Sequence, residues 1–165
     1  ILSRLRSSSA SVNVNYTEVI ILMQDGTEVP ARLLLKDTDL DLAYVLPIKN
    51  KHSEHEDIIF SKVPQQAKEN RTPIILDEVV SIGKLRQTLY RQSTLRRGSV
   101  NAVINKPRQY YVIENTIPGT PVFDKNGKWL GVVVYKMVGS SPSEIVTLPA
   151  ADILEIAEQV RTRLK

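Results

Sequence analysis

Cysteine is missing from this 165-residue sequence, and histidine is rare, with only 2 copies. The lack of cysteine excludes disulfide bonds and thiolate metal sites. No apolar run approaches the roughly 20 residues of a membrane-spanning helix. Aromatic residues make up only 5% of the chain, without the stacking pattern of single-stranded nucleic-acid binders. The sequence is 42% hydrophobic, which is enough for one compact domain or two small ones that share a cleft.

Both histidines lie in one polar stretch, as His52 and His55, among the acids Glu54, Glu56 and Asp57. Two histidines three residues apart could hold a metal ion weakly. Such a run is more commonly a solvated loop. We therefore expect no metal site and no cofactor.

The first third of the chain predicts a hairpin followed by an acidic turn. Residues 19–23 and 29–35 are rich in strand formers, and Asp25-Gly26 between them is a hairpin signal. Aspartates alternate over residues 37–41, directly before another apolar run. By itself this pattern predicts an acidic turn that leads into a buried strand.

In the second half, residues 87–97 alternate loosely, which predicts a long strand. A stronger hairpin signal follows, in which Pro121–Phe123 and Trp129–Val134 flank Asn126-Gly127. The Asn-Gly pair supplies the positive backbone angles that a tight hairpin turn needs. These short strands bounded by turns favour a Greek-key barrel or sandwich.

The chain enters this hairpin through Pro118, Gly119, Thr120 and Pro121. Two prolines restrict the backbone on both sides of the glycine. A rigid loop of this kind could present backbone N–H groups to a cleft, or it could be a stiff connection and nothing more.

A final helix is predicted from about residue 150 to 164. Its apolar positions recur at steps of three and four, which places them on one face: Ile153, Ala157, Val160 and Leu164. We expect this helix to dock on the domain through that face.

A basic stretch runs from Lys84 to Ile113 in the second half of the chain. Seven basic residues and no acidic one occur there, although the whole chain carries only +4: Lys84, Arg86, Arg91, Arg96, Arg97, Lys106 and Arg108. A basic face could bind nucleic acid, an anionic membrane or an acidic protein. Spread along strands, it could equally be a solvated surface that resists edge aggregation.

Two of these blocks resemble trypsin-like serine proteases, especially the HtrA/Deg type. Pro118-Gly119-Thr120-Pro121-Val122 resembles the family's nucleophile loop, P-G-N-S-G-G-P-L, without the asparagine, the serine and one glycine. Asp37–Ala43 resembles the block around the catalytic aspartate, and the match carries over to Asp41. Ile1–Arg6 resembles the opening of the segment with the catalytic histidine and places Arg6 at the histidine position.

The resemblance implies an all-β fold with two trypsin-like Greek-key barrels and a C-terminal helix. On this basis the first barrel, complete or incomplete, covers residues 1–60. The second barrel covers 61–149, with residues 74–83 resembling its first strand, and the docking helix covers 150–165. In the working enzyme the aspartate orients the histidine. Without a histidine, Asp41 would need another partner, such as a hydroxyl, a backbone N–H or Arg6.

The resemblance also implies the function we expect. Since the base and the nucleophile are both missing at their positions, the chain is expected to be a catalytically dead relative, a pseudoprotease, that binds a protein or peptide. An active trypsin-like endopeptidase and an anion-binding module are the alternatives. An acidic partner is compatible with the basic stretch, an extracytoplasmic location is suggested by the family alone, and the oligomeric state stays open.

Overall fold

The computed structural model describes residues 18–23, 25–48, 72–138 and 141–163. Its first part is an antiparallel sheet of three strands, in the order β1-β2-β3: β1 (Val19–Leu22), β2 (Glu28–Asp37) and β3 (Leu42–Pro47). The predicted hairpin is present, with Gly26 at φ +91° in its turn. Among the described residues, β1 and β3 each pair only with β2, so both outer edges are open.

The second part is a closed barrel with the strand order β4-β5-β6-β9-β8-β7. Because β6 pairs with β9 and β4 with β7, strands that follow each other in sequence are not always neighbours, as expected for a Greek-key barrel. The six strands are β4 (Glu78–Lys84), β5 (Ser93–Ile104), β6 (Tyr110–Ile113), β7 (Pro121–Asp124), β8 (Trp129–Val138) and β9 (Ser141–Pro149).

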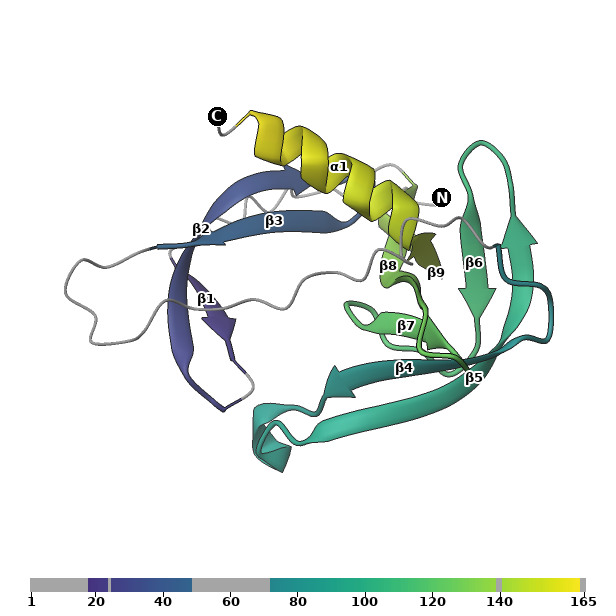
Figure 1. The fold of residues 1–165 in the computed structure, drawn as a ribbon, viewed down its shortest axis with the longest axis horizontal. Coiled ribbons are helices and arrows are strands. Elements are labelled where there is room, and N and C mark those ends of the chain that lie inside the picture. The colour runs from purple at the N-terminus through teal and green to yellow at the C-terminus, as the bar shows by residue number, and fades with distance from the viewer. Residues whose placement is uncertain (1–17, 24, 49–71, 139–140, 164–165) are drawn as a thin grey trace, which may run out of the picture.

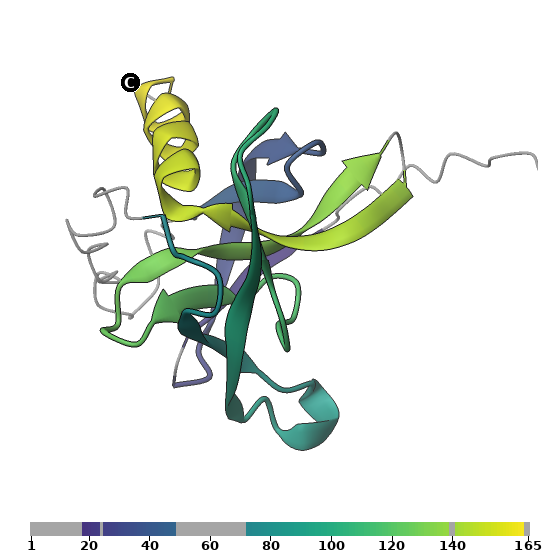
Figure 2. The same ribbon diagram turned by 90° about the vertical axis from the view of Figure 1, so that its right-hand side faces the viewer.

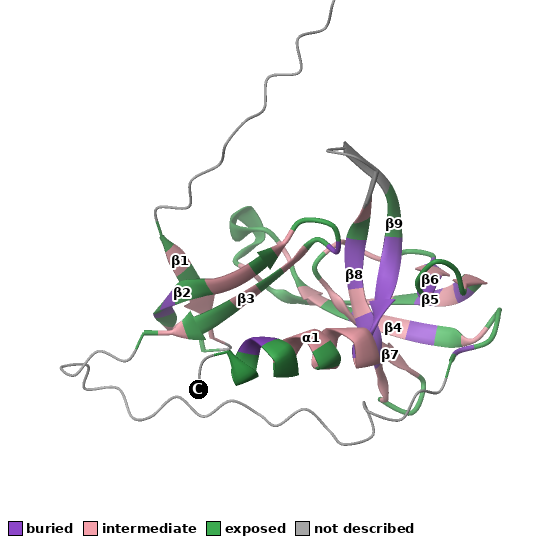
Figure 3. Ribbon diagram, turned by 90° about the horizontal axis from the view of Figure 1, so that it is seen from above, coloured by how far each residue is buried: buried purple, intermediate pink, exposed green. Residues whose placement is uncertain are grey.

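The core lies inside this barrel. Val79, Val100 and Val122 are almost completely buried and belong to one cluster. Figure 3 shows the buried residues concentrated on the barrel strands, with far fewer in the three-stranded sheet. Close packing of branched side chains from alternate positions is what stabilises a barrel of this size.

The helix α1 (Ala150–Thr162) follows β9 directly and runs from the barrel toward β2 and β3 (Figure 1). Ile153 and Ile156 pack against a second core cluster, which includes Val134 and Leu148 of the barrel, and Val160 is buried. The predicted docking helix is therefore present. No helix in the described part of the chain is both long and apolar enough to cross a membrane.

Two strand boundaries differ from the sequence prediction. The predicted strand 74–83 begins only at Glu78, because Ile74–Leu76 form an exposed turn in which Leu76 takes φ +73°. The predicted strand 87–97 begins only at Ser93. Residues 87–89 instead form a short 3-10 helix, η2 (Gln87–Leu89), at the tip of the β4–β5 hairpin.

Candidate functional site

The acidic turn between β2 and β3 is held by one of its own carboxylates. Asp37 Oδ1 accepts hydrogen bonds from the backbone N–H groups of Asp39 at 3.1 Å and Leu40 at 3.0 Å. Asp41 ends the turn at φ +54°, in the left-handed region that aspartate tolerates. The Asp37 carboxylate therefore shapes the turn and places Leu40 and Asp41.

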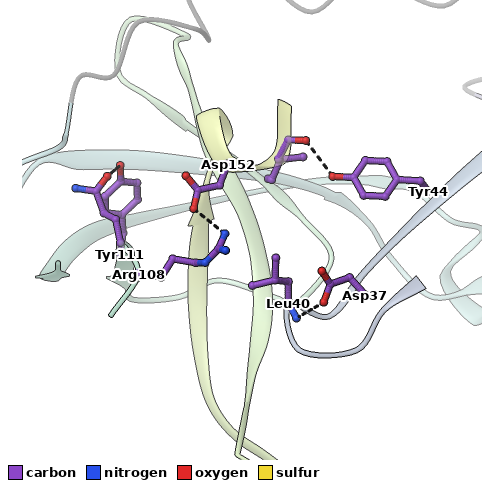
Figure 4. Close-up of polar contacts among 8 residues, drawn as sticks. Asp37, Leu40, Tyr44, Arg108, Tyr111 and Asp152 are labelled. Carbon is purple, nitrogen blue, oxygen red and sulfur yellow. Dashed lines mark hydrogen bonds and ion pairs between the residues drawn. The ribbon is translucent and has the colours of Figure 1, made fainter. Parts of the chain in front are cut away.

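This turn docks the three-stranded sheet onto the barrel. Leu40 is buried and belongs to the same cluster as Tyr110, Val146 and Leu148 of the barrel. The Tyr44 hydroxyl donates a hydrogen bond of 2.9 Å to the Ile153 carbonyl of α1, as Figure 4 shows. Burial, and secondarily the nearby carboxylate of the turn, raises the pKa of Tyr44.

Asp41 itself bonds to the backbone of β8. Its Oδ2 accepts a hydrogen bond of 3.1 Å from the Tyr135 N–H. The Asp41 side chain is exposed. A carboxylate bonded to a backbone N–H is one of the arrangements expected for this aspartate in the absence of a histidine.

The loop before β7 is a closed β-turn. The Thr120 N–H donates to the Ile117 carbonyl at 3.2 Å, with Pro118 and Gly119 as the two central residues. Gly119 has φ +84°, and proline followed by a glycine with positive φ is typical of a type II turn. The Thr120 hydroxyl donates to the same Ile117 carbonyl at 2.6 Å.

Two further backbone groups of this turn, the Gly119 N–H and the Thr120 carbonyl, bond to β8. The Gly119 N–H donates to the Val133 carbonyl at 2.7 Å, and the Val133 N–H donates to the Thr120 carbonyl at 2.9 Å. Pro118 and Pro121 carry no N–H. None of the four residues from Pro118 to Pro121 therefore has a backbone N–H to offer a developing oxyanion, which needs such donors free.

The structure thus brings the two protease-like blocks together on one strand. The Pro118–Pro121 turn bonds to Val133, and Asp41 bonds to Tyr135, two residues further along β8. Two residues of strand span about 7 Å. Sequence reasoning missed the role of the β8 backbone, because an amide N–H leaves no signal in the residue types. It also missed Leu40, although a leucine within an acidic run was a visible sign.

Three residues that the sequence analysis considered lie outside the described residues. These are Arg6, placed at the histidine position by the resemblance, and His52 and His55, for which we expect no metal site. The proposed substitution of Arg6 for the histidine stays a prediction.

The basic residues do not gather into one patch. Lys84, Arg86 and Arg91 lie at the η2 end of the β4–β5 hairpin, whereas Lys106 and Arg108 lie at the opposite end of β5. A strand of this length is roughly 40 Å long. Arg96 and Arg97 lie within β5.

Three of the arginines bond to acids on neighbouring elements. Arg108 lies 3.1 Å from Asp152 in the first turn of α1, a contact drawn in Figure 4. Arg91 lies 3.6 Å from Glu28, and Arg97 pairs with Glu78. Burial, and secondarily the Asp152 carboxylate, raises the pKa of Tyr111.

A groove of about 540 Å³ opens beside Asp41. It is formed by the three-stranded sheet and the acidic turn, and its apolar lining includes Val19, Ile20, Leu33 and Val45. Three acids and one lysine lie along it: Glu18, Asp37, Asp41 and Lys36. The groove is therefore apolar inside and carries an excess of negative charge.

Comparison with known proteins gives matches in structure only. The sequence matches no protein-family model, and no curated protein sequence matches it. The HtrA-type protease AlgW with a decapeptide is similar at a TM-score of 0.61 and 18% identity, over 88% of this chain and 45% of that chain. The serine endoprotease from Yersinia pestis is similar at a TM-score of 0.58 and 23% identity, over 87% of this chain and 48% of that chain.

A third similar structure is the protease domain of MamO from Magnetospirillum magneticum in its apo form. It has a TM-score of 0.54 and 16% identity, over 84% of this chain and 74% of that chain. The chain thus spans somewhat less than half of the AlgW and Yersinia pestis proteases. These similarities, together with the six-stranded barrel and the C-terminal helix, show that the chain has the trypsin-like fold of HtrA-type serine proteases.

Proposed function

We propose that the chain is a catalytically inactive member of this fold that binds an extended peptide in the groove beside Asp41. The observation that carries the first half of the proposal is the closed turn at Pro118–Pro121. Its Gly119 and Thr120 N–H groups and the Thr120 hydroxyl all donate to carbonyl oxygens. Acyl transfer needs a free nucleophile, a base beside it and donors for the oxyanion.

Thr120 is a poor candidate nucleophile for a further reason. Its hydroxyl proton is already donated to a carbonyl, and Asp41, the nearest family-equivalent triad residue, bonds to a backbone N–H of β8. An aspartate in this fold acts through a histidine and does not itself take the proton. The arrangement fixes the backbone of β8 and offers no route for proton transfer through the described residues.

The groove supports the second half of the proposal. Its apolar lining lies on a sheet whose β1 and β3 edges are open among the described residues. An extended peptide can add to such an edge through backbone hydrogen bonds, while alternate side chains enter the apolar groove. Two AlgW structures with this fold hold a decapeptide and a tripeptide.

The charge of the groove selects the peptide. Three acids against one lysine favour a peptide with basic residues between its apolar ones. The probe we suggest is a fluorescein-labelled decapeptide of alternating valine and lysine, beside the same peptide with glutamate in place of lysine. The expected result is saturable binding of the lysine peptide, which mass spectrometry finds uncut.

Two matched variants test the location. Leu33→Asn places a neutral polar group in the groove, whereas Leu46→Asn changes a similarly exposed leucine outside the lining, at 40% and 36% exposure. Leu33→Asn is expected to weaken binding about tenfold, since it removes apolar contact area and buries an amide without a partner under the peptide. Equal effects of both variants, or equal binding of both peptides, would refute the groove. Cleavage of the peptide would refute inactivity and favour an active endopeptidase.

A further inference from the structure

The tip of the β4–β5 hairpin, residues 82–95, projects beyond the barrel (Figures 1 and 2). It is ordered by its own backbone: the Leu85 N–H donates to the Gln92 carbonyl at 2.8 Å, and the Tyr90 N–H donates to the Gln87 carbonyl at 2.9 Å. No residue of η2 is buried. The β4–β5 tip is therefore a formed protrusion that packs little of its surface against the rest of the chain.

Large apolar side chains lie exposed on this tip. Ile82 and Leu95 are cross-strand partners, so their side chains share one face of the hairpin, and they are 45% and 66% exposed. Ser81 precedes Ile82 in β4 and is buried. Because successive side chains of a strand point to opposite faces, Ile82 and its partner Leu95 lie on the outside of the barrel. At the end of the hairpin, Leu89 is 54% and Tyr90 is 87% exposed. Several exposed large apolar side chains on one protruding hairpin indicate an interaction site.

Cations flank these apolar side chains, and acids are absent from the sequence between residues 79 and 113. Lys84 and Arg86 are exposed, and their side chains have no hydrogen-bond or ion-pair partner in the described part of the chain. Arg91 is engaged by Glu28 at 3.6 Å. The tip thus presents two free positive charges beside a projecting leucine and tyrosine.

We propose that the β4–β5 tip docks on an anionic lipid bilayer, with Leu89 and Tyr90 entering the interface and Lys84 and Arg86 contacting the headgroups. The apolar side chains of the β4–β5 tip project outward, so they can insert into a partner such as a bilayer. A peptide would need a groove, which the tip does not offer. Tyrosine suits the bilayer interface because its ring is apolar and its hydroxyl stays wet. Basic residues near an anionic surface add electrostatic attraction. The proposal is independent of the peptide groove, which lies on the three-stranded sheet.

The test is co-sedimentation of the whole chain with vesicles. We expect the bound fraction on vesicles of phosphatidylcholine with phosphatidylserine to exceed that on phosphatidylcholine alone, with a partition coefficient about tenfold higher. Raising the salt from about 0.1 M to 1 M shortens the screening length from about 10 Å to 3 Å and should release most of the protein. Equal binding to both vesicles would overturn the proposal.

Two pairs of variants locate the contact. Leu89→Ser with Tyr90→Asn should lower the partition coefficient about tenfold. Ile75→Ser with Leu76→Asn should leave it unchanged, although Ile75 and Leu76 are 59% and 76% exposed and Leu76, like Tyr90, has a positive φ.

Arg86→Glu and Lys106→Glu form the second pair, since they change the net charge equally at opposite ends of β5. Only Arg86→Glu should weaken vesicle binding. Equal losses from both would overturn the assignment to the tip. Binding to polyglutamate without binding to phosphatidylserine vesicles would also overturn it, in favour of an acidic protein partner.

Discussion

Replacing Leu40 by alanine tests how the three-stranded sheet is attached to the barrel. Leu40 is only 9% exposed, and its neighbours in the cluster are barrel residues such as Val134 and Leu148. Truncation of a buried leucine costs about 2–5 kcal/mol, depending on how far the site collapses. Because Leu40 lies on a turn that can relax, we expect about 2–3 kcal/mol.

Urea unfolding is the appropriate assay, with far-ultraviolet circular dichroism for the whole chain and fluorescence of Trp129 for the barrel. Trp129 is the only tryptophan in the chain, and it lies in β8. The loss should appear as a lower midpoint at an unchanged slope. The melting temperature should fall by roughly 4–12 °C.

Leu46→Ala is the control. Leu46 is a β3 leucine with 36% exposure, and its truncation should change the free energy of unfolding by less than about 0.5 kcal/mol. If Leu40→Ala cost less than about 1 kcal/mol, or no more than the control, the claim that Leu40 anchors the three-stranded sheet to the barrel would be refuted.

Four further single substitutions test individual positions of the structure. The folded chain keeps the Tyr44 proton longer than the unfolded chain, so stability should fall as pH rises above 10.0, and Tyr44→Phe should reduce this alkaline loss in thermal melts. Gly131→Ala would drive a Cβ into the Leu148 carbonyl oxygen of β9 and should cost about 3 kcal/mol or more. Gly119→Ala, with φ +84° and open space around it, should cost only about 1–2 kcal/mol in the same urea titration. Asp41→Ala should speed hydrogen exchange of the β8 amide that it bonds, while lowering stability by less than about 1 kcal/mol.

The sequence was sufficient where local chemistry determines the structure. The β7–β8 hairpin forms where strand formers flank Asn126-Gly127, but the positive φ expected of the pair is found only at Gly127. Asn126 does not need it, because Asp124 Oδ1 shapes the turn by accepting hydrogen bonds from the Asn126 and Lys128 N–H groups at 2.8 Å. The C-terminal helix follows its three- and four-residue periodicity in the same way. In both cases a few neighbouring residues carry the whole signal.

Local chemistry was insufficient at the η2 turn. The alternating pattern of residues 87–97 predicts a strand there, but Tyr90 and Arg91 both take positive φ, a conformation that neither residue favours. The resemblance places a strand from Ile74 onward, but Leu76 also takes a positive φ, and residues 74–76 form an exposed turn.

The candidate site shows both outcomes. The two protease-like blocks were found from their residue types, and the fold shared with HtrA-type proteases is confirmed. Their meeting on β8 depends on a hydrogen bond between residues 94 positions apart, from Tyr135 to Asp41, and on a backbone N–H that no residue type reveals. A contact between residues so far apart in the sequence becomes visible only once the fold has brought the acidic turn and β8 together.

The most direct test of the central claim is labelling of the chain with a fluorophosphonate, with trypsin as the positive control. Such a probe reacts only with a serine that a neighbouring base has already activated. The closed turn at Pro118–Pro121 predicts no labelling, before or after addition of the valine–lysine decapeptide. Stoichiometric labelling of one serine, lost on heat denaturation, would contradict the account and would identify the serine of a working active site.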